Sequence, residues 1–482
     1  MPRSGKKLVL VEINEITWDL IDPLIQQGKL PTFAWLKQKG TWASPMSVEM
    51  PPQLDPWITW TTVYTGRPQS EHNLFFLQQP PETIKAKRIW EICNEQGLKV
   101  GVYGSLCSWP PPREFNGYYI PDTFSQDFST HPAKLQPIQE LNLTYTRSIR
   151  LPADRDNLLF KIKLGSKLTG LGLKPSTMTR IMRQLARERL NPAVRWQRVV
   201  LQPFVNFDFF ERLYRRYQPD FASFHTNHVA HYMHTYWKAM KPEIFPQETS
   251  AEEVRTYGRA VEFGYQSADE LLSRVVKLVD ENTVLMIASS MGQQPFISDL
   301  KKGKAINQLK SLDRLMQILG VEHKARALST MSDQFNIYAD DPATVEHVVH
   351  ALEVAYVDKP SLPMFVVKRV ESGITATLKR YDEIGETSRI YFPHLGDNNN
   401  IFQYDDLVYS TGMVKSGFHH PKGMMILYGA GVRAGGTVDA CNNLDLAPTM
   451  LTILGLPVPD EMKGRVLHEA LIQQHTAAAI SS

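Results

Sequence analysis

The stretch KLVLVEINEITWDLIDPLIQQGKLP, residues 7–31, decides the fold. It opens with a continuous apolar run that ends in polar side chains, and residues 16–27 then repeat apolar positions with helical spacing until Gly28. A continuous apolar run is typical of a strand that is buried on both faces. The stretch therefore predicts a strand and a helix, with a second helix opening at Leu30 and Pro31.

Similar apolar runs recur along the chain and are separated by longer amphipathic segments. These runs are residues 99–103, 221–224, 283–288 and 423–428. Strands that alternate with helices predict a mostly parallel sheet with helices on both faces. In such sheets ligands bind beyond the carboxyl ends of the strands, so the residues that close each run are candidates for chemistry.

One basic segment interrupts this alternation. Residues 125–216 contain no convincing buried strand but several basic helical stretches, chiefly 178–190 and 195–217. We expect this segment to form a helical cap inserted between core strands.

A second interruption lies further along the chain. Short strand-like runs between residues 335 and 378, followed by a polar loop at 396–400, predict a small α+β insertion. The predicted parts of the chain are the core segments 1–124, 217–330 and 411–482, the basic helical cap 125–216 and the α+β insertion 331–410.

Composition excludes several classes of protein. Hydrophobic residues make up 43% of the 482 residues and charged residues 21%, which excludes collagen-like, low-complexity and disordered chains. The three cysteines form no CxxC pair, so we expect neither a disulfide framework nor a cysteine zinc site. Unpaired cysteines fit a reducing compartment and predict a cytoplasmic location. No apolar stretch of about 18 residues predicts a membrane span, and the N-terminal run is too short for a signal peptide.

Charge is unevenly distributed. The net charge is only +3, but residues 147–216 hold 16 Lys and Arg against 5 Asp and Glu. This excess indicates either the solvated faces of amphipathic helices or contact with an anionic partner, such as a glycan, a nucleotide diphosphate or a membrane surface approached peripherally. Nucleic acid is not expected, because no recognised binding motif accompanies the charge. The oligomeric state stays open.

Polar residues close the first predicted strand. Asn14 and Glu15 follow the apolar run, and Glu12 shares the face of Asn14 because side chains alternate along a strand. We expect these groups to point into the crevice at the carboxyl end of the sheet.

A carboxylate precedes the next helical run. A proline-rich loop ends at Asp55, immediately before the run WITWTTVYTGRP at residues 57–68. At that place Asp55 either caps the first turn of the helix or belongs to an anion-binding corner. Both interpretations are open.

Histidines gather at two places. Four of them recur at intervals of three, namely His225, His228, His231 and His234. Asn227 precedes His231 by four residues, which places the two side chains on one helical face. His419 and His420 supply distant imidazoles that we expect to converge on this cluster. Imidazole is both a common metal ligand and a general base near neutral pH.

Together these motifs resemble the alkaline phosphatase superfamily, and within it the type I phosphodiesterase and nucleotide pyrophosphatase branch. The resemblance covers roughly residues 7–110, 215–296 and 410–467, and is clearest in LDLAPTMLTILGLPVPDEMKGRVL near the C-terminus. WITWTTVYTGRPQSEHNLF resembles the segment after the family nucleophile, TNHVAHYMHTYW a ligand segment, TVLMIASSMG an Asp-His-Gly strand end, and SGFHHPKGMMILYGAGV the last ligand histidine. The resemblance implies a three-layer α/β/α core.

The chain departs from the family at most ligand positions. Asn14 stands where the first-strand aspartate is expected, Ser290-Met291 where the Asp-His pair is expected, Asn227 at the partner of His231, and Asp55-Pro56 at the nucleophile. Only His231 and His419 match as ligands.

These losses change the expected cofactor. Two adjacent divalent ions need carboxylates to offset their charge, so a dinuclear zinc centre is not expected. Asn227, His231 and His419 hold one ion at most, because an amide is a poor third zinc ligand. A metal-free site is equally consistent with the sequence.

Three functions remain open. The first is hydrolysis or transfer of a phosphoester or nucleotide diphosphate, with His231 and His419 holding one metal or acting as acid and base. The second is metal-independent sugar transfer from a nucleotide sugar or on a glycan, with Asp55 as nucleophile and Glu12 or Glu15 in acid–base roles. The third is a catalytically silent binding protein. The residues predicted to bind an anionic small molecule or glycan are Asn14, His228, Ser290 and His420.

Overall fold

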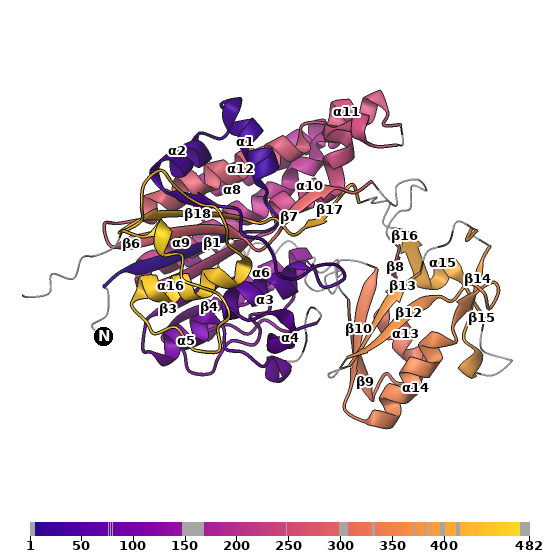
Figure 1. The fold of residues 1–482 in the computed structure, drawn as a ribbon. Coiled ribbons are helices and arrows are strands. Elements are labelled where there is room, and N and C mark those ends of the chain that lie inside the picture. The colour runs from indigo at the N-terminus through magenta and orange to yellow at the C-terminus, as the bar shows by residue number, and fades with distance from the viewer. Residues whose placement is uncertain are drawn as a thin grey trace, which may run out of the picture.

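A computed structural model of the chain shows a large α/β core with a smaller α+β unit beside it (Figure 1). The residues that the structure describes are 5–75, 77, 79, 81–146, 168–246, 248–297, 307–329, 333–370, 373–379, 381, 383–385, 387–395, 401–410 and 415–472. Within these ranges no helix is both long enough and apolar enough to cross a bilayer.

The stretch that opens the chain forms the centre of the main sheet. Strand β1 (Lys7–Ile13) lies between β5 (Phe221–Thr226) and β6 (Thr283–Ser289) and pairs in parallel with both. Leu8 is in register with Phe221 on one side and with Val284 on the other. The buried strand predicted from the apolar run is confirmed.

The other strands extend this sheet to eight members. Their order is β19-β2-β18-β6-β1-β5-β3-β4. The outer strands are β2 (Thr41–Ala43), β3 (Val100–Tyr103), β4 (Gly117–Ile120), β18 (Met424–Gly429) and β19 (Gly436–Val438). Only β18 runs antiparallel to its neighbours, so the mostly parallel sheet is confirmed.

Alternate residues of β1 face two hydrophobic cores. Val9 and Val11 pack into one core and Leu8 and Leu10 into the other, as the alternation of strand side chains requires. The first core lies under α1 (Trp18–Gln26), α2 (Pro31–Lys39), α9 (Leu201–Tyr217), α10 (His228–Met240) and α12 (Ala260–Val275). The second lies under α3 (Pro56–Thr65), α5 (Ile89–Glu95) and α16 (Leu446–Leu454). The three-layer α/β/α core is confirmed.

The predicted cap is only partly separate from the core. Its last helix, α9, packs on the sheet through Phe207 and Phe210, whose rings contact Phe224 of β5. Further helices on the core are α4 (Gln69–His72), α6 (Gln136–Thr146), α8 (Pro175–Leu190) and α11 (Ala251–Tyr257). The basic charges of α9 therefore belong to a core helix, because its aromatic face needs burial against β5.

The smaller unit has its own sheet and hydrophobic core. Strands β9 (Ala325–Ser329), β10 (Gln334–Ala339), β12 (Phe365–Val370) and β13 (Gly373–Leu378) pair antiparallel in the order β12-β13-β10-β9. They pack with α13 (Leu312–Ile318) and α14 (Pro342–Glu353). Short elements complete it, namely β11 (Tyr356–Val357), β14 (Arg389–Tyr391), β15 (Ile401–Gln403) and α15 (Tyr404–Leu407).

This unit begins before the predicted boundary at residue 331. Strand β8 (Asn307–Leu309) pairs with β16 (Val408–Ser410), and Leu315 of α13 belongs to the same hydrophobic core. The predicted polar loop at 396–400 lies outside the described residues.

A glycine allows the turn after α2 to approach β18 closely. A Cβ atom at Gly40 would lie 2.1 Å from the carbonyl oxygen of Leu427. We therefore expect Gly40→Ala to lower the free energy of unfolding by about 2 kcal/mol, as overpacking against backbone does. Urea denaturation measures this change. Gly170→Ala is the control, because no atom lies within 4 Å of its Cβ position. Equal stability of the two variants would contradict the predicted close approach.

Candidate functional site

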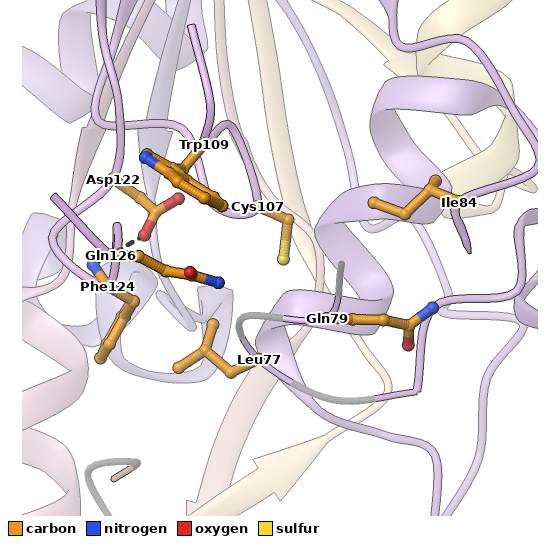
Figure 2. Close-up of a pocket in the computed structure, with 8 residues that line it drawn as sticks. All are labelled: Leu77, Gln79, Ile84, Cys107, Trp109, Asp122, Phe124 and Gln126. Carbon is orange, nitrogen blue, oxygen red and sulfur yellow. Dashed lines mark hydrogen bonds between the residues drawn. The ribbon is translucent and has the colours of Figure 1, made fainter. Parts of the chain in front are cut away.

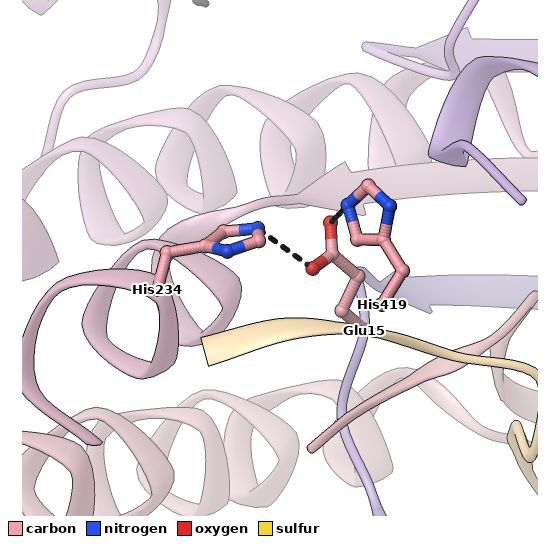
Figure 3. A group of neighbouring side chains, drawn as sticks. All are labelled: Glu15, His234 and His419. Carbon is pink, nitrogen blue, oxygen red and sulfur yellow. Dashed lines mark ion pairs between the residues drawn. The ribbon is translucent and has the colours of Figure 1, made fainter. Parts of the chain in front are cut away.

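Three charged or chargeable side chains meet beyond the carboxyl end of β1. An oxygen of the Glu15 carboxylate lies 2.9 Å from Nε2 of His234, and its other oxygen lies 3.7 Å from Nε2 of His419 (Figure 3). The three groups can each offer one ligand atom, and these atoms lie within 4.8 Å of one another. Glu15 and His419 are buried, and His234 is half-buried.

Three elements position this group. Glu15 follows β1 with a left-handed backbone conformation, at φ 60°, which is uncommon for a residue with a side chain. His234 lies on α10, and His419 lies on β17 (Gly417–His420), which pairs with β7 (Gly292–Pro295). Gly417 lets β17 approach α10, because a Cβ atom there would lie 2.5 Å from the carbonyl oxygen of Met233.

Backbone carbonyls fix the orientation of both imidazoles. Nδ1 of His234 donates to the carbonyl of Gly417 at 2.8 Å, and Nδ1 of His419 donates to the carbonyl of Leu54 at 2.8 Å. A carbonyl can only accept, so each Nδ1 carries a proton. Both Nε2 atoms therefore face the Glu15 carboxylate.

The surroundings determine the charge of Glu15 and of His419. Burial by itself raises the pKa of Glu15, but the imidazoles of His234 and His419 and hydrogen bonds from His234 and Gln293 outweigh it and lower the pKa to about 2. Burial lowers the pKa of His419 to about 4, although the Glu15 charge opposes this shift. At neutral pH Glu15 is ionised and the imidazole of His419 is neutral.

Asp55 stands beside this cluster. It occupies the position before α3, but its carboxylate makes no capping hydrogen bond. One of its oxygens lies 3.4 Å from Nδ1 of His419. Burial raises the pKa of Asp55 to about 7, the charge of Glu15 adds to this shift, and Lys415 opposes it. Of the two interpretations from the sequence, a simple capping role is not observed.

A comparison with known proteins assigns the chain to a protein family. The model of the type I phosphodiesterase/nucleotide pyrophosphatase family matches residues 8–386. The chain belongs to this family. The family consists of hydrolases of the phosphodiesterase and nucleotide pyrophosphatase type, and the resemblance inferred from the sequence is confirmed.

Solved structures of distant relatives also match. One is the murine ectonucleotide pyrophosphatase/phosphodiesterase 5, determined as an inactive form in complex with AMP. It is 12% identical with a TM-score of 0.41, over 94% of this chain and 96% of that chain. The human ectonucleotide pyrophosphatase/phosphodiesterase 5 is 11% identical with a TM-score of 0.42, over the same shares. No curated protein matches the sequence. At such low similarity the site is interpreted from this chain's own residues.

Two asparagines, Asn14 and Asn227, stand at positions where a dinuclear metal centre needs carboxylate ligands. Nδ2 of Asn14 donates to Oδ1 of Asn227 at 2.8 Å and to Glu15 at 2.9 Å, while Oδ1 of Asn14 accepts from the indole of Trp60 at 2.8 Å. All polar atoms of the Asn14 side chain are thus engaged within the protein. Asn14 does not fit the ligand set of a dinuclear metal centre.

Ser290, at the position where the resemblance implies an Asp-His pair, is also engaged within the protein. The hydroxyl groups of Ser290 and Thr59 hydrogen-bond each other at 2.8 Å, and both side chains are fully buried. Neutral hydroxyl groups cannot offset the charge of a second divalent ion. Ser290 therefore stabilises the contact between α3 and β6, which does not support its predicted role in substrate binding.

Glu12 is a structural carboxylate. It is fully buried and accepts hydrogen bonds from Tyr64 at 2.7 Å, from Ser105 at 2.8 Å and from Nδ1 of His225 at 2.9 Å. Glu12 and Asn14 both contact α3, so the shared face that was predicted is present. The burial argues against the predicted catalytic role of Glu12, because a catalytic group must touch the substrate.

The other predicted histidines lie outside the cluster. His228 is buried with Nδ1 2.8 Å from the hydroxyl of Thr226, and burial lowers its pKa to about 3. His420 alternates with His419 along β17 and accepts the backbone N–H of Lys422 at 3.2 Å. Neither contact supports the predicted substrate-binding roles.

The cluster uses His234 where the sequence favoured His231. Both residues lie on α10, one turn apart, so the spacing of three already placed them on neighbouring positions of one helical side. Glu15 is the direct neighbour of Asn14, so a carboxylate stands one residue after the position where the resemblance implies one. The predicted approach of His419 to the histidines of α10 is observed at His234, since the centres of the two rings lie 5.5 Å apart. Glu15 and Asp55 also lie beside His419.

A separate hollow lies near the ends of β3 and β4. Cys107, Trp109, Asp122 and Phe124 are among the residues that line it (Figure 2). Sequence reasoning missed it, because its walls come from loops that carry no motif. Its aromatic rings provide flat apolar surface at the same edge of the sheet as the cluster.

His72 follows α3 and is a neutral buried imidazole. Its Nδ1 accepts the backbone N–H of Leu74 at 3.1 Å, so Nε2 carries the proton and donates to Thr62 at 3.2 Å. Burial lowers its pKa to about 3, and the charge of Arg67 lowers it further.

This pKa makes stability depend on pH. The unfolded imidazole, with a pKa near 6.5, binds a proton on acidification while the folded one does not, so stability is lost as the pH falls below 6.5. Between pH 7 and pH 5 the His72 imidazole alone lowers the free energy of unfolding by about 2 kcal/mol. Urea denaturation at both pH values should show a smaller loss for His72→Gln than for the parent protein. An unchanged pH dependence would contradict this assignment.

Proposed function

We propose that this protein hydrolyses a phosphodiester or nucleotide diphosphate bond at the site formed by Glu15, Asp55, His234 and His419. The observation that carries the proposal is the Asp55 carboxylate at the start of α3, which makes no capping hydrogen bond and stands at the position that matches the family nucleophile. Membership of a hydrolase family supports the class of reaction. The substrate is an anionic small molecule.

The proposed chemistry uses a general base and groups that offset negative charge. Asp55 takes a proton from the attacking water, because its carboxylate is uncapped and partly exposed and exchanges its proton near neutral pH. As the water oxygen bonds to phosphorus, the bond from phosphorus to the leaving oxygen breaks, and this oxygen leaves as an anion that solvent protonates. The start of α3 and the ammonium group of Lys415 offset the charge that develops on the phosphoryl oxygens. Glu15 stays ionised and holds the imidazoles in place, so it is not the general acid.

Sugar transfer remains a less favoured prediction. A carboxylate mechanism needs a second accessible carboxyl group beside Asp55. Glu12 is fully buried, and both oxygens of Glu15 face imidazoles. The alternative of a catalytically silent binding protein is tested by the hydrolysis assay described next, because a silent protein hydrolyses no substrate.

The test compares two aspartates that both precede helices. Asp55→Asn should lower kcat for bis(p-nitrophenyl) phosphate or a nucleotide diphosphate by at least about 100-fold, the usual contribution of a general base. Asp341→Asn is the matched control, because Asp341 caps α14 through its side chain and lies in the smaller unit. Unchanged kcat in Asp55→Asn would contradict the proposed base. Undetectable hydrolysis by the parent protein would favour the silent alternative.

We also propose a reducing, cytoplasmic location. Its support is that Cys93, Cys107 and Cys441 are all free thiols, as expected from their spacing. Such thiols persist where glutathione and thioredoxin keep cysteines reduced.

The exposed surface of helix α8 supports the prediction of peripheral contact with an anionic membrane. It buries polar residues, namely Thr177, Gln184 and Glu188, and exposes Met178, Met182 and Leu185 at intervals of four and three. Its arginines include Arg183, Arg187 and Arg189, which are exposed. Apolar side chains beside arginines fit the boundary between acyl chains and anionic headgroups.

Vesicle sedimentation tests this contact. The protein should sediment with vesicles that contain phosphatidylglycerol and not with pure phosphatidylcholine. Changing Met182 and Leu185 to Ser should weaken sedimentation, whereas the same changes at Val366 and Ile401, which are exposed on the smaller unit, should not. No sedimentation with either vesicle, or equal sedimentation of both double variants, would contradict the proposal.

A further inference from the structure

The cluster of Glu15, His234 and His419 has the composition of a metal-binding site. It combines one carboxylate with two imidazoles, which are common ligands of divalent transition metals. The three ligand atoms lie within 4.8 Å of one another although they come from the end of β1, from α10 and from β17. The site is largely shielded from solvent, since Glu15 and His419 are buried.

The hydrogen bonds around the cluster prepare the ligand atoms. Both Nδ1 atoms donate to backbone carbonyls, at Gly417 and at Leu54, so each imidazole presents its Nε2 to Glu15. Such bonds from the second nitrogen to a carbonyl are typical of metal-bound histidines. The carboxylate is also held, because it accepts from Gln293 and from Asn14.

Two imidazole nitrogens share one carboxylate. Nε2 of His234 lies 2.9 Å from one oxygen of Glu15, and Nε2 of His419 lies 3.7 Å from the other oxygen. A carboxylate oxygen and a ring nitrogen 2.9 Å apart are bridged by a proton or by a cation. A divalent cation satisfies all three atoms together, whereas a proton satisfies only one pair.

We propose that Glu15, His234 and His419 bind one divalent transition-metal ion, with zinc as the best match to nitrogen and oxygen donors. The site differs from the ligand set that the family resemblance implied, since it keeps His419 and replaces Asn227 and His231 by Glu15 and His234. Three protein ligands leave one coordination position open, which is usual where a metal takes part in chemistry. The inference stands independently of the proposed hydrolysis.

Metal binding is measured without substrate. The protein is freed of metal with a chelator and titrated with zinc chloride by calorimetry, and cobalt chloride is used to follow ligand-field absorption. We expect one equivalent of metal and a cobalt spectrum of a site with nitrogen and oxygen donors. Glu15→Gln and His234→Gln should each weaken zinc binding by at least about 100-fold.

His231→Gln is the matched control, because His231 lies one turn before His234 on the same helix. It should bind zinc as the parent protein does. Circular dichroism and urea denaturation confirm that each variant is folded, and a folded His234→Gln protein with unchanged zinc affinity would overturn the proposal. Loss of binding in His231→Gln alone would also overturn it, in favour of the site predicted from the sequence.

Failure of this inference is distinguishable from failure of the proposed function. Absence of stoichiometric zinc and cobalt binding by the parent protein overturns the metal site and identifies the cluster as a protonated ion pair. The proposed hydrolysis is judged by Asp55→Asn, which removes no ligand of the metal.

Discussion

The buried carboxylate of Glu15 constrains the whole carboxyl end of the sheet. A charge in the protein interior is tolerated only when partners with opposite charge or hydrogen-bond donors surround it. Glu15 finds these partners on α10, on β7 and at the end of β1, through His234, Gln293 and Asn14, and His419 of β17 lies beside it. Segments that lie far apart in the sequence are thereby held around one group, and Asp55 is brought to the edge of the same site.

Neutral side chains occupy the positions where the sequence resemblance implies further charged ligands. Asn14 is paired with Asn227 and with the indole of Trp60, and Ser290 is paired with Thr59. A site that had simply lost its ligands would leave unpaired polar atoms, which are costly when buried. Instead these side chains satisfy one another. The remaining charge is concentrated on the side of α10 and β17, which is where chemistry is expected.

The strands and the general place of the site were predictable because they depend on local patterns. The run that forms β1 is apolar at consecutive positions, and polar residues such as Glu15 follow it. The exact side chains of the cluster were not predictable. His231 and His234 are both compatible with one side of α10, and only the position of β17, which approaches α10 at Gly417, favours His234. The alternation of side chains along β1 predicted that Glu12 points into the crevice, as Asn14 does. In the structure Glu12 is instead enclosed by Tyr64, Ser105 and His225.

By itself the sequence determined the order of strands and helices, the mostly parallel sheet, the family and the edge at which polar residues gather. The sheet and the order of its elements follow from apolar periodicity, which the chain carries locally. The family follows from the resemblance of several motifs and of their order. Only the tertiary structure decided which polar side chains are buried and paired and which face a shared site. That choice depends on distances between Glu15, Asp55, His234 and His419, which are set by packing among separate elements and not by spacing along the chain.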